Sequence, residues 1–313
     1  MVRTVFTTDP CEAAEFIKRG GLVAFPTETV YGLGADAFDP AAVEKIFKAK
    51  LRPADNPLIV HVSSVDQIQN VVATITETAS LLIDKFFPGP LTLVLKKHDQ
   101  VPFITTAGLD TVGVRMPRLD IANRFLASCG VPVAAPSANL SGRPSPTTWQ
   151  AVAEDLDRRI NCILQGEATE TGLESTVVDC TGDVPIVLRS GSVTLQQLRE
   201  IIADTRAVSD RDDLNRSPGT RHQHYKPTAK VVIIAHPDAV EKAAADTAYI
   251  GLARSVTPFD HQRVCSDADE YAREFYEFLR ECDRRRIHKI YCQEVPQTGI
   301  GMALMDRLCR AAS

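Results

Sequence analysis

The sequence lacks the motifs that most readily identify an enzyme. It has no GxxxxGK[ST] phosphate loop, no HExxH metal-binding helix and no GxSxG nucleophile elbow. These absences exclude a P-loop enzyme, the common zinc-protease helix and an elbow serine. Gly32-Leu33-Gly34 is only a weak glycine signal, because Ala37 fills the position of the third glycine in a dinucleotide fingerprint. Any function must therefore come from less common groups of residues.

An excess of positive charge and paired cysteines are also missing. The 35 Lys and Arg residues against 40 Asp and Glu give a net charge of -5, so any contact with nucleic acid would be local. None of the eight cysteines forms a CxxC pair, which excludes a zinc ribbon or redox pair by spacing, and we expect reduced thiols in the core. No apolar run approaches the roughly 18 residues of a membrane span, and the N-terminus has no signal-peptide core. We expect a cytoplasmic protein that has no contact with membranes.

What is present indicates a globular chain of two domains. Of the 313 residues 44% are hydrophobic and 24% are charged, and the length suits two domains. Residues 1–205 alternate apolar runs with amphipathic stretches, which predicts an α/β or α+β domain with one sheet partly covered by helices. Residues 206–229 are polar and predict a linker or lid, and residues 230–313 predict a small, doubly wound, Rossmann-like α/β domain.

The expected elements follow from these patterns. The predicted strands are 22–25, 58–62, 91–95, 112–115, 131–135, 175–179, 186–188, 230–235, 249–253 and 287–293. The predicted helices are 40–48, 76–87, 120–128, 147–155, 194–202, 239–245, 267–284 and 301–310. Asp39-Pro40 and Thr194 are cap signals for two of them. Tyr271, Phe275, Phe278 and Leu279 share one apolar face of 267–284.

Two early segments place polar side chains beside apolar elements. Residues 26–34 follow the first of the predicted strands and are either a ligand-binding strand end or a capped turn with glycines at special backbone angles. Residues 48–57 place Lys50 and Arg52 after a helix. A solvated basic helix end is one interpretation. The flanking prolines favour the other, in which a fixed Arg fork beside Asn56 grips phosphate oxygens.

Three later segments carry further candidates. Arg115 lies inside an apolar strand and needs an anion, either a structural carboxylate or that of a substrate. The buried strand 131–135 runs into small and polar residues through position 142, which suit either a ligand near backbone N–H groups or a Ser/Asn turn. Ser175 begins a strand and Arg189 ends one, and each is unremarkable alone.

Residues 217–227 combine Pro-Gly with His222, His224 and Tyr225. Two histidines do not make a metal site. The combination is unusual for a passive tether and also fits a mobile lid that closes over a ligand.

Taken together, PTETVYGLG, KAKLRP, APSANLSG, ESTVVD and SPGTRHQHYKP, in this order, resemble the two-domain form of the L-threonylcarbamoyladenylate synthase family. The resemblance implies a YrdC-like first domain, a twisted sheet with a concave and locally basic face. It implies a nucleotidyltransferase that joins L-threonine, bicarbonate or CO2, and ATP into threonylcarbamoyl-AMP and pyrophosphate. A partner transferase complex would then move the threonylcarbamoyl group to adenosine 37 of tRNAs that read ANN codons, so that contact with tRNA is indirect or weak.

The resemblance also assigns roles to residues. The catalytic KxR and SxN residues would be Lys50, Arg52, Ser137 and Asn139. The ATP contacts would be Arg52, Asn56, Thr111, Ser137, Ser145, Arg189 and, from the linker, Tyr225. The threonine contacts would be Thr29, His61, Arg115, Ser175 and the backbone at Ala135. Gln223 stands where many relatives carry a basic residue, which argues against a phosphate contact from that position.

The implied chemistry agrees with these residue types. A neutral threonine amine captures CO2, and the carbamate oxygen attacks the α-phosphorus and expels pyrophosphate, so no covalent nucleophile is needed. Arg115 would hold the threonine carboxylate. Lys50 and Arg52 would stabilise the pyrophosphate together with Mg2+ carried by the ATP phosphates, since no pair of Asp residues for a metal is evident.

Two other functions remain in view. The basic concave face would also suit an RNA-binding module, whose affinity would fall steeply with salt. A carbamoyl-adenylate transferase of the hydrogenase-maturation type has a similar YrdC-like domain. That class also carries zinc-finger cysteine pairs and an acylphosphatase domain, and this sequence has neither.

Overall fold

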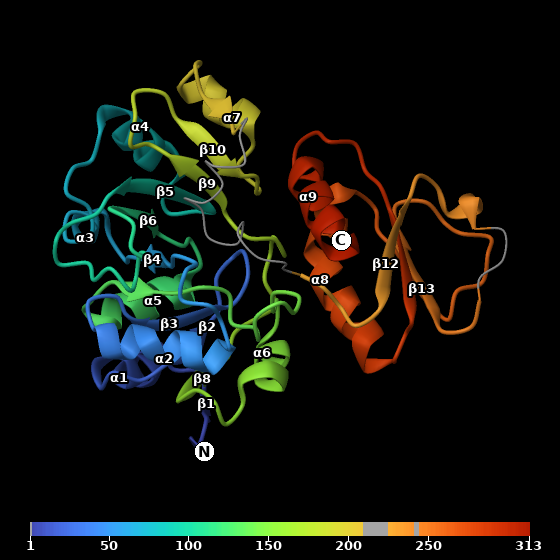
Figure 1. Ribbon diagram of the computed structural model, residues 1–313, viewed down its shortest axis with the longest axis horizontal. Helices are drawn as coiled ribbons and strands as arrows, with labels where there is room; N and C mark the ends of the chain where they lie inside the picture. Colours follow the sequence, from blue (N-terminus) through green and yellow to red (C-terminus); the bar gives the residue numbers. More distant parts are fainter. Residues whose placement is uncertain (1, 209–224, 241–243) are drawn as a thin grey trace.

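The computed structural model describes residues 2–208, 225–240 and 244–313, which form two α/β bodies (Figure 1). The larger is an eleven-stranded mixed sheet in the order β1-β8-β2-β3-β7-β4-β6-β5-β9-β10-β11. Its strands are β1 (Val5–Thr7), β2 (Val23–Phe25), β3 (Gly32–Asp36), β4 (Ile59–His61), β5 (Leu91–Lys96), β6 (Thr111–Arg115), β7 (Val133–Ala134), β8 (Cys162–Leu164), β9 (Thr176–Asp179), β10 (Ile186–Arg189) and β11 (Arg206–Ala207). Its helices are α1 (Pro10–Lys18), α2 (Pro40–Lys50), α3 (Val65–Ile68), α4 (Glu77–Phe86), α5 (Asp120–Cys129), α6 (Trp149–Leu156) and α7 (Leu195–Ile201).

The large sheet has an apolar core on each face. Along β2, Val23 and Phe25 pack with α1 and α5, whereas Ala24 between them packs with residues of α2 and α6. This alternation is the two-residue period of a strand that is buried on both sides. Helices therefore cover both faces of the sheet in this region.

Local signals explain where the helices begin. Asp39 accepts a hydrogen bond from the Ala41 N–H, and Pro40 is the first helical residue, as the sequence predicted. Thr194 forms a capping box with Gln197, which confirms the predicted cap.

The segment after β2 differs from expectation. Gly32 and Gly34 belong to β3, which pairs antiparallel with β2, so the interpretation of a capped turn at these glycines is wrong. Neither glycine has a positive φ. A Cβ on Gly34 would lie 2.6 Å from Val133 Cγ1, so this glycine permits close packing between neighbouring strands.

The smaller body is a parallel sheet in the order β12-β15-β13-β14. It contains β12 (Lys230–Ile234), β13 (Thr247–Gly251), β14 (His261–Val264), β15 (Lys289–Gln293), α8 (Ala268–Arg284) and α9 (Gly301–Ala312). The parallel α/β arrangement predicted for this region is confirmed. The predicted helix 239–245 is wrong over its described residues, where a 3-10 turn at Pro237–Ala239 is followed by non-helical backbone.

The two long helices of the smaller body face the larger one (Figure 1). Tyr276 and Arg280 of α8 and Arg307 of α9 form hydrogen bonds with Glu174 and Asp155 of the larger body. The two sheets are thus joined through polar side chains on these helices.

The cysteines agree in part with the prediction of reduced thiols in the core. All eight cysteines are free, and six are buried, but Cys11 and Cys309 are exposed, so the prediction of core thiols is wrong for these two. Among the described residues no helix is long and apolar enough to cross a membrane.

Candidate active site

A cavity of about 720 Å³ opens where several segments of the large sheet meet the start of the smaller body. Every predicted site residue except Asn56 and Thr111 lines it. The lining residues are Thr27, Thr29, Val30, Gly32, Lys50, Arg52, Ile59, His61, Arg115, Ala135, Pro136, Ser137, Asn139, Ser141, Ser145, Glu174, Ser175, Arg189 and Tyr225.

Lys50 holds the backbone of the loop after β7. It is the last residue of α2, and the next residue, Leu51, ends the helix in the left-handed conformation with a φ of 54°. The Lys50 ammonium donates to the carbonyl oxygens of Ser137 and Asn139, and its Nζ lies 3.4 Å from Asn139 Oδ1. Burial lowers the pKa of Lys50 well below its usual value. In this structure Lys50 therefore acts on the SxN residues rather than pointing freely into the cavity.

Asn139 braces its own loop. The Ser137 hydroxyl donates to Asn139 Oδ1 over 2.5 Å, and Asn139 Nδ2 donates to the carbonyls of Leu140 and Arg143, each at 2.8 Å. With Oδ1 also near Lys50, the whole Asn139 side chain is engaged. Ser137 and Asn139 are thus held in fixed positions at the cavity wall.

Arg52 faces the cavity without an anionic partner among the described residues. Its Nη2 lies 3.4 Å from the carbonyl oxygens of Asn56 and Pro57, and its Nε is buried with no hydrogen-bond partner. Burial lowers the pKa of this guanidinium to about 10. A charged group with a spare donor and only two long contacts to carbonyls is well suited to bind an anion. Asn56, fully buried, supplies its carbonyl to Arg52 and does not line the cavity.

Arg115 has an internal anion. Its Nη2 pairs with Glu28 Oε1 at 2.8 Å, its Nη1 donates to Thr29 Oγ1 over 2.7 Å, and its Nε donates to the Gly89 carbonyl. The structural carboxylate that the sequence left as one alternative is therefore present, and it is Glu28. The sequence shows Glu28 only as part of the polar segment 26–34. No local signal indicates that its carboxylate meets Arg115 of a different strand.

His61 lies beside Arg115, since β4 and β6 pair in parallel and place these two residues opposite each other. Burial, with the nearby Arg115 charge, lowers the pKa of His61 to about 3, so the imidazole is neutral at neutral pH. Its Nδ1 is buried without a hydrogen-bond partner, and its ring meets Phe25 edge-on. A neutral imidazole in this position can exchange a hydrogen bond with a ligand without adding positive charge.

A second polar group surrounds Ser175 and Glu174. Arg189 donates to the Ser175 carbonyl over 3.0 Å and to its hydroxyl over 3.1 Å, and Thr92 Oγ1 lies 2.8 Å from the same hydroxyl. Ser145 donates to Glu174 Oε1 over 2.6 Å. These bonds bring three distant predicted residues, Ser145, Ser175 and Arg189, to one wall of the cavity.

Glu174 stays ionised although it is buried. Burial alone would raise its pKa, but the Arg307 and Arg189 charges and the Ser145 hydrogen bond hold the pKa below the ordinary value. Sequence reasoning quoted Glu174 in the ESTVVD motif without giving it a role. No local signal shows that Arg307 and Tyr276 of the smaller body contact it.

Tyr225 closes the cavity on the side of the smaller body. It is 5% exposed and stacks on Tyr276 of α8 with 5.2 Å between ring centroids. Burial raises the pKa of Tyr225 to about 12, so it is a neutral phenol. Gln223, His222 and His224, which also entered the lid prediction, lie outside the described residues.

Thr111 does not line the cavity. It begins β6, and Arg115 ends it, so about 13 Å of strand separates them at roughly 3.3 Å per residue. Among the described residues no group of three His, Cys, Asp or Glu side chains is arranged to hold a metal ion.

Comparison with known proteins agrees with this geometry. Residues 15–191 match a family model described as telomere recombination (Sua5, YciO and YrdC), and residues 193–313 match threonylcarbamoyl-AMP synthase, C-terminal domain. The chain is 42% identical to threonylcarbamoyl-AMP synthase of Pyrococcus abyssi, covering 96% of this chain and 93% of that protein. It is 39% identical to the Bacillus subtilis enzyme of that name, covering 98% and 94%.

A solved structure supports the same assignment. The crystal structure of Pyrococcus abyssi Sua5 complexed with L-threonine superposes with a TM-score of 0.90 at 39% identity, covering 100% of this chain and 97% of that one. The α/β fold with a second, parallel-sheet domain and the family resemblance read from the five motifs are thereby confirmed. The chain belongs to the threonylcarbamoyl-AMP synthase family, in the two-domain form.

Proposed function

We propose that the cavity is the site at which this chain, as a nucleotidyltransferase, converts ATP, L-threonine and bicarbonate or CO2 into threonylcarbamoyl-AMP and pyrophosphate. This assignment rests mainly on Arg52, a cation at the cavity wall. Its buried Nε has no hydrogen-bond partner, and no carboxylate of the described residues pairs with it. Four cationic side chains line the cavity against one carboxylate, Glu174. That balance suits a polyphosphate.

The nucleotide occupies the wall formed by Arg52, Ser137, Asn139, Ser145 and Arg189, beneath Tyr225. Arg52 neutralises the phosphate charge that develops as pyrophosphate leaves. Lys50 contributes by fixing Ser137 and Asn139, because its ammonium already serves three oxygen atoms of that loop. Asn56 acts through the carbonyl that it offers to Arg52. Thr111, also predicted to contact ATP, does not line the cavity in this structure.

Threonine occupies the wall formed by Thr29, His61, Arg115 and Ser175. The Arg115 Nη1, which contacts Thr29, faces this wall and holds the threonine carboxylate. The ion pair between Arg115 Nη2 and Glu28 fixes the orientation of the guanidinium. The N–H of Ala135 donates to the Ile59 carbonyl, so the contact from Ala135 falls to its own carbonyl oxygen. Neutral His61 leaves the threonine amine free of a second cation.

The reaction needs positioning more than covalent help. The neutral amine adds to CO2 and loses a proton to give a carbamate. A carbamate oxygen attacks the α-phosphorus, the bond to the bridging oxygen breaks, and pyrophosphate departs toward Arg52. Mg2+ enters as part of the ATP complex and screens the phosphates. Held reactants and fixed donors supply the rate enhancement.

The product is a mixed anhydride suited to transfer. We place the chain in the cytoplasm, upstream of a transferase complex that delivers the threonylcarbamoyl group to adenosine 37 of tRNAs reading ANN codons. Contact between this chain and tRNA is weak or indirect, because its net charge is -5. The proposal divides the chain into domains 1–205 and 230–313. Most of the segment 206–229 predicted as linker or lid lies outside the described residues.

The test measures pyrophosphate release while ATP, threonine and bicarbonate are omitted one at a time. Release that requires all three supports the proposal. Release without threonine would make the protein an ATP pyrophosphohydrolase. Tight and salt-sensitive tRNA binding without pyrophosphate release would favour the RNA-binding module.

A further inference from the structure

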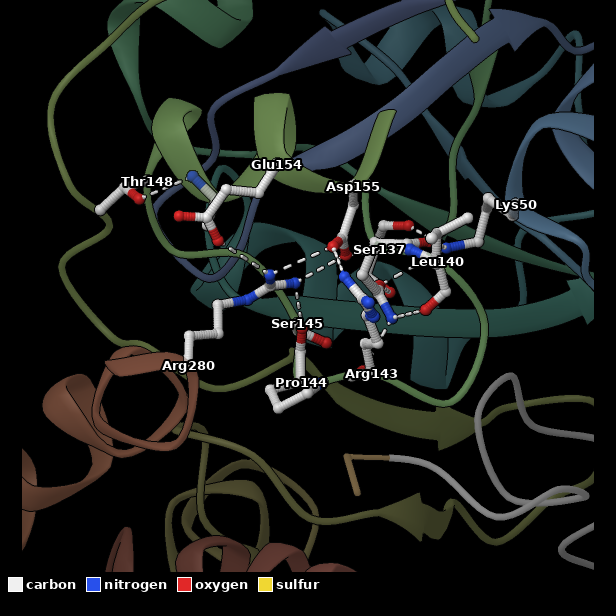
Figure 2. Close-up of polar contacts among 12 residues, drawn as sticks. Lys50, Ser137, Leu140, Arg143, Pro144, Ser145, Thr148, Glu154, Asp155 and Arg280 are labelled. Carbon is white, nitrogen blue, oxygen red and sulfur yellow. Dashed lines mark hydrogen bonds and ion pairs between the residues drawn. The ribbon is translucent and has the colours of Figure 1, made fainter. Parts of the chain in front are cut away.

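The loop that carries Asn139 and Ser145 is held from outside the cavity by one carboxylate, Asp155 of α6. Asp155 Oδ2 accepts a hydrogen bond from the Leu140 N–H at 3.1 Å, and its Oδ1 accepts one from Arg143 Nη1 at 2.8 Å. The Asp155 side chain is fully covered. The carboxylate therefore fixes the backbone between two residues of the cavity wall (Figure 2).

The smaller body completes this arrangement through Arg280 of α8. Arg280 Nη2 donates to Asp155 Oδ2 over 2.8 Å and to the Pro144 carbonyl over 2.6 Å. The Arg280 side chain is only 4% exposed. Pro144 immediately precedes Ser145, so one guanidinium contacts both the carboxylate and the loop itself (Figure 2).

Electrostatics make Asp155 depend on Arg280. Burial alone would raise the pKa of Asp155, but the hydrogen bond and charge of Arg280, followed by the Arg143 hydrogen bond, hold it below its ordinary value. Arg143 is 55% exposed and so screened by water. The buried partner is thus the one from the other domain, and removing it leaves Asp155 largely uncompensated.

The opposite side of the same loop is held by Lys50. The Ser141 N–H donates to the Lys50 carbonyl over 2.9 Å, while the Lys50 ammonium binds the carbonyls on either side of Ala138. The loop lies between Lys50 on the cavity side and the Asp155–Arg280 pair on the domain side. A shift on the domain side is passed directly to Asn139 and Ser145.

We propose that Arg280 is a positioning residue for the nucleotide site, through which docking of the C-terminal domain sets the geometry of loop 139–145. The inference rests on the proposed function, because it assigns ATP to the wall that this loop forms. Arg280 does not line the cavity, so its effect passes through Asp155 and the loop. The same domain touches the far end of the loop, where Arg307 pairs with Glu174, the acceptor of Ser145.

Arg284 provides a matched control. It lies one turn further along α8 and pairs across the same domain boundary with Glu154 at 3.0 Å, but its side chain is 41% exposed. Within the described part of the chain Arg284 pairs with Glu154 and Glu277 and has no bond to loop 139–145. Glu154 also lies 3.8 Å from Arg280 Nη1, a longer contact than the one that Arg280 makes with Asp155. The Arg284→Ala substitution therefore removes an interdomain ion pair without touching the loop.

The experiment compares full-length wild type with Arg280→Ala, Arg280→Lys and Arg284→Ala in steady-state pyrophosphate release, with thermal unfolding as the measure of folding. We expect Arg280→Ala to raise the KM for ATP about tenfold and to lower kcat, because a small misplacement of site groups is costly. The KM for threonine should change far less. Arg280→Lys should recover part of the loss, and Arg284→Ala should match wild type.

A double substitution separates positioning from simple weakening of the fold. Asp155→Asn should reproduce the ATP defect, and Arg280→Ala with Asp155→Asn should add little to either single change, because both act through one contact. Equal rises in the KM of ATP and threonine, or a lowered unfolding temperature with unchanged kinetic constants, would overturn the inference. If wild type itself released no pyrophosphate, the proposed function would fail instead, and the two failures are thus distinct.

Discussion

Guanidinium groups occupy two regions of the molecule, and their partners differ. At the cavity, the hydrogen bonds of Arg52 to the part of the chain that the structure describes are two, both to carbonyl oxygens at 3.4 Å. At the domain boundary, Arg280 and Arg307 each meet a carboxylate, at 2.8 and 3.1 Å. A cation without an anion is held ready for a ligand, whereas a paired buried cation joins parts of the fold. Residues of the first region should act directly on turnover. Those of the second should mainly affect stability, although Arg280 also affects turnover through loop 139–145.

The largest expected effect is on turnover. Arg52→Ala should lower kcat/KM for ATP by about 10²–10³-fold, the usual loss when one donor to a developing charge is removed. The free energy of unfolding should change by less than about 1 kcal/mol, because the two carbonyl contacts are weak. Pyrophosphate release and urea unfolding measure the two quantities. Turnover like that of wild type would remove Arg52 from the phosphate site.

The second prediction concerns stability. Arg307→Met leaves Glu174 buried without its main cation and should reduce the free energy of unfolding by about 3–5 kcal/mol. Combining it with Glu174→Gln should restore part of this loss, since no charge is then stranded. Urea unfolding measures both variants. A loss as small as that of exposed Arg284→Ala, at most about 1 kcal/mol, would contradict the division between regions.

Arg115 combines features of both regions: it lines the cavity, as Arg52 does, and it pairs with an internal carboxylate, as Arg280 and Arg307 do. Arg115→Lys should raise the KM for threonine about tenfold, since an ammonium cannot contact Glu28, Thr29 and a substrate carboxylate as a planar fork does. The KM for ATP should stay near the wild-type value. An unchanged threonine KM would assign Arg115 to structure alone.

The smallest effect is the pH dependence of the domain boundary. The pKa of Asp155 is lower in the folded state than in the unfolded state, where it lies near 4. The ionised carboxylate therefore stabilises the fold above the unfolded pKa. This stabilisation is lost as the pH falls through the folded pKa. The free energy of unfolding should fall more steeply in wild type than in Asp155→Asn as pH is lowered from about 5. Urea titrations at successive pH values measure this. Parallel slopes would show that Asp155 does not contribute.

Much of the fold was predictable because its signals are local. Apolar runs marked strands such as β5 and β6, and the predicted apolar face of α8, with Tyr271 and Phe275, is buried. Strand β3 was missed because its sequence, GLGAD, has too little apolar side chain for the strand period. Helix α1 was missed even though Asp9-Pro10 repeats the cap signal seen at Asp39-Pro40.

The site was predictable only as far as its motifs reach. The motifs named the residues that line the cavity, but they did not show that Arg115 meets Glu28 or that Lys50 binds the SxN backbone. Arg280 and Arg307 were outside every motif. Their partners lie 125 and 133 positions away in the sequence, and such a separation leaves no local signal.

The ion pairs at the domain boundary have a consequence for shortened versions of the protein. A fragment ending near residue 208 would keep Asp155 and Glu174 but lose their partners from the smaller body, Arg280 and Arg307. It would also expose Leu173 and Val30, which pack within the apolar cluster of the smaller body. Such a fragment would carry the incompletely neutralised carboxylates of Asp155 and Glu174 beside a solvent-exposed apolar patch. Producing it in a tractable form should require neutral amides at both acidic positions and polar replacements at the two aliphatic ones.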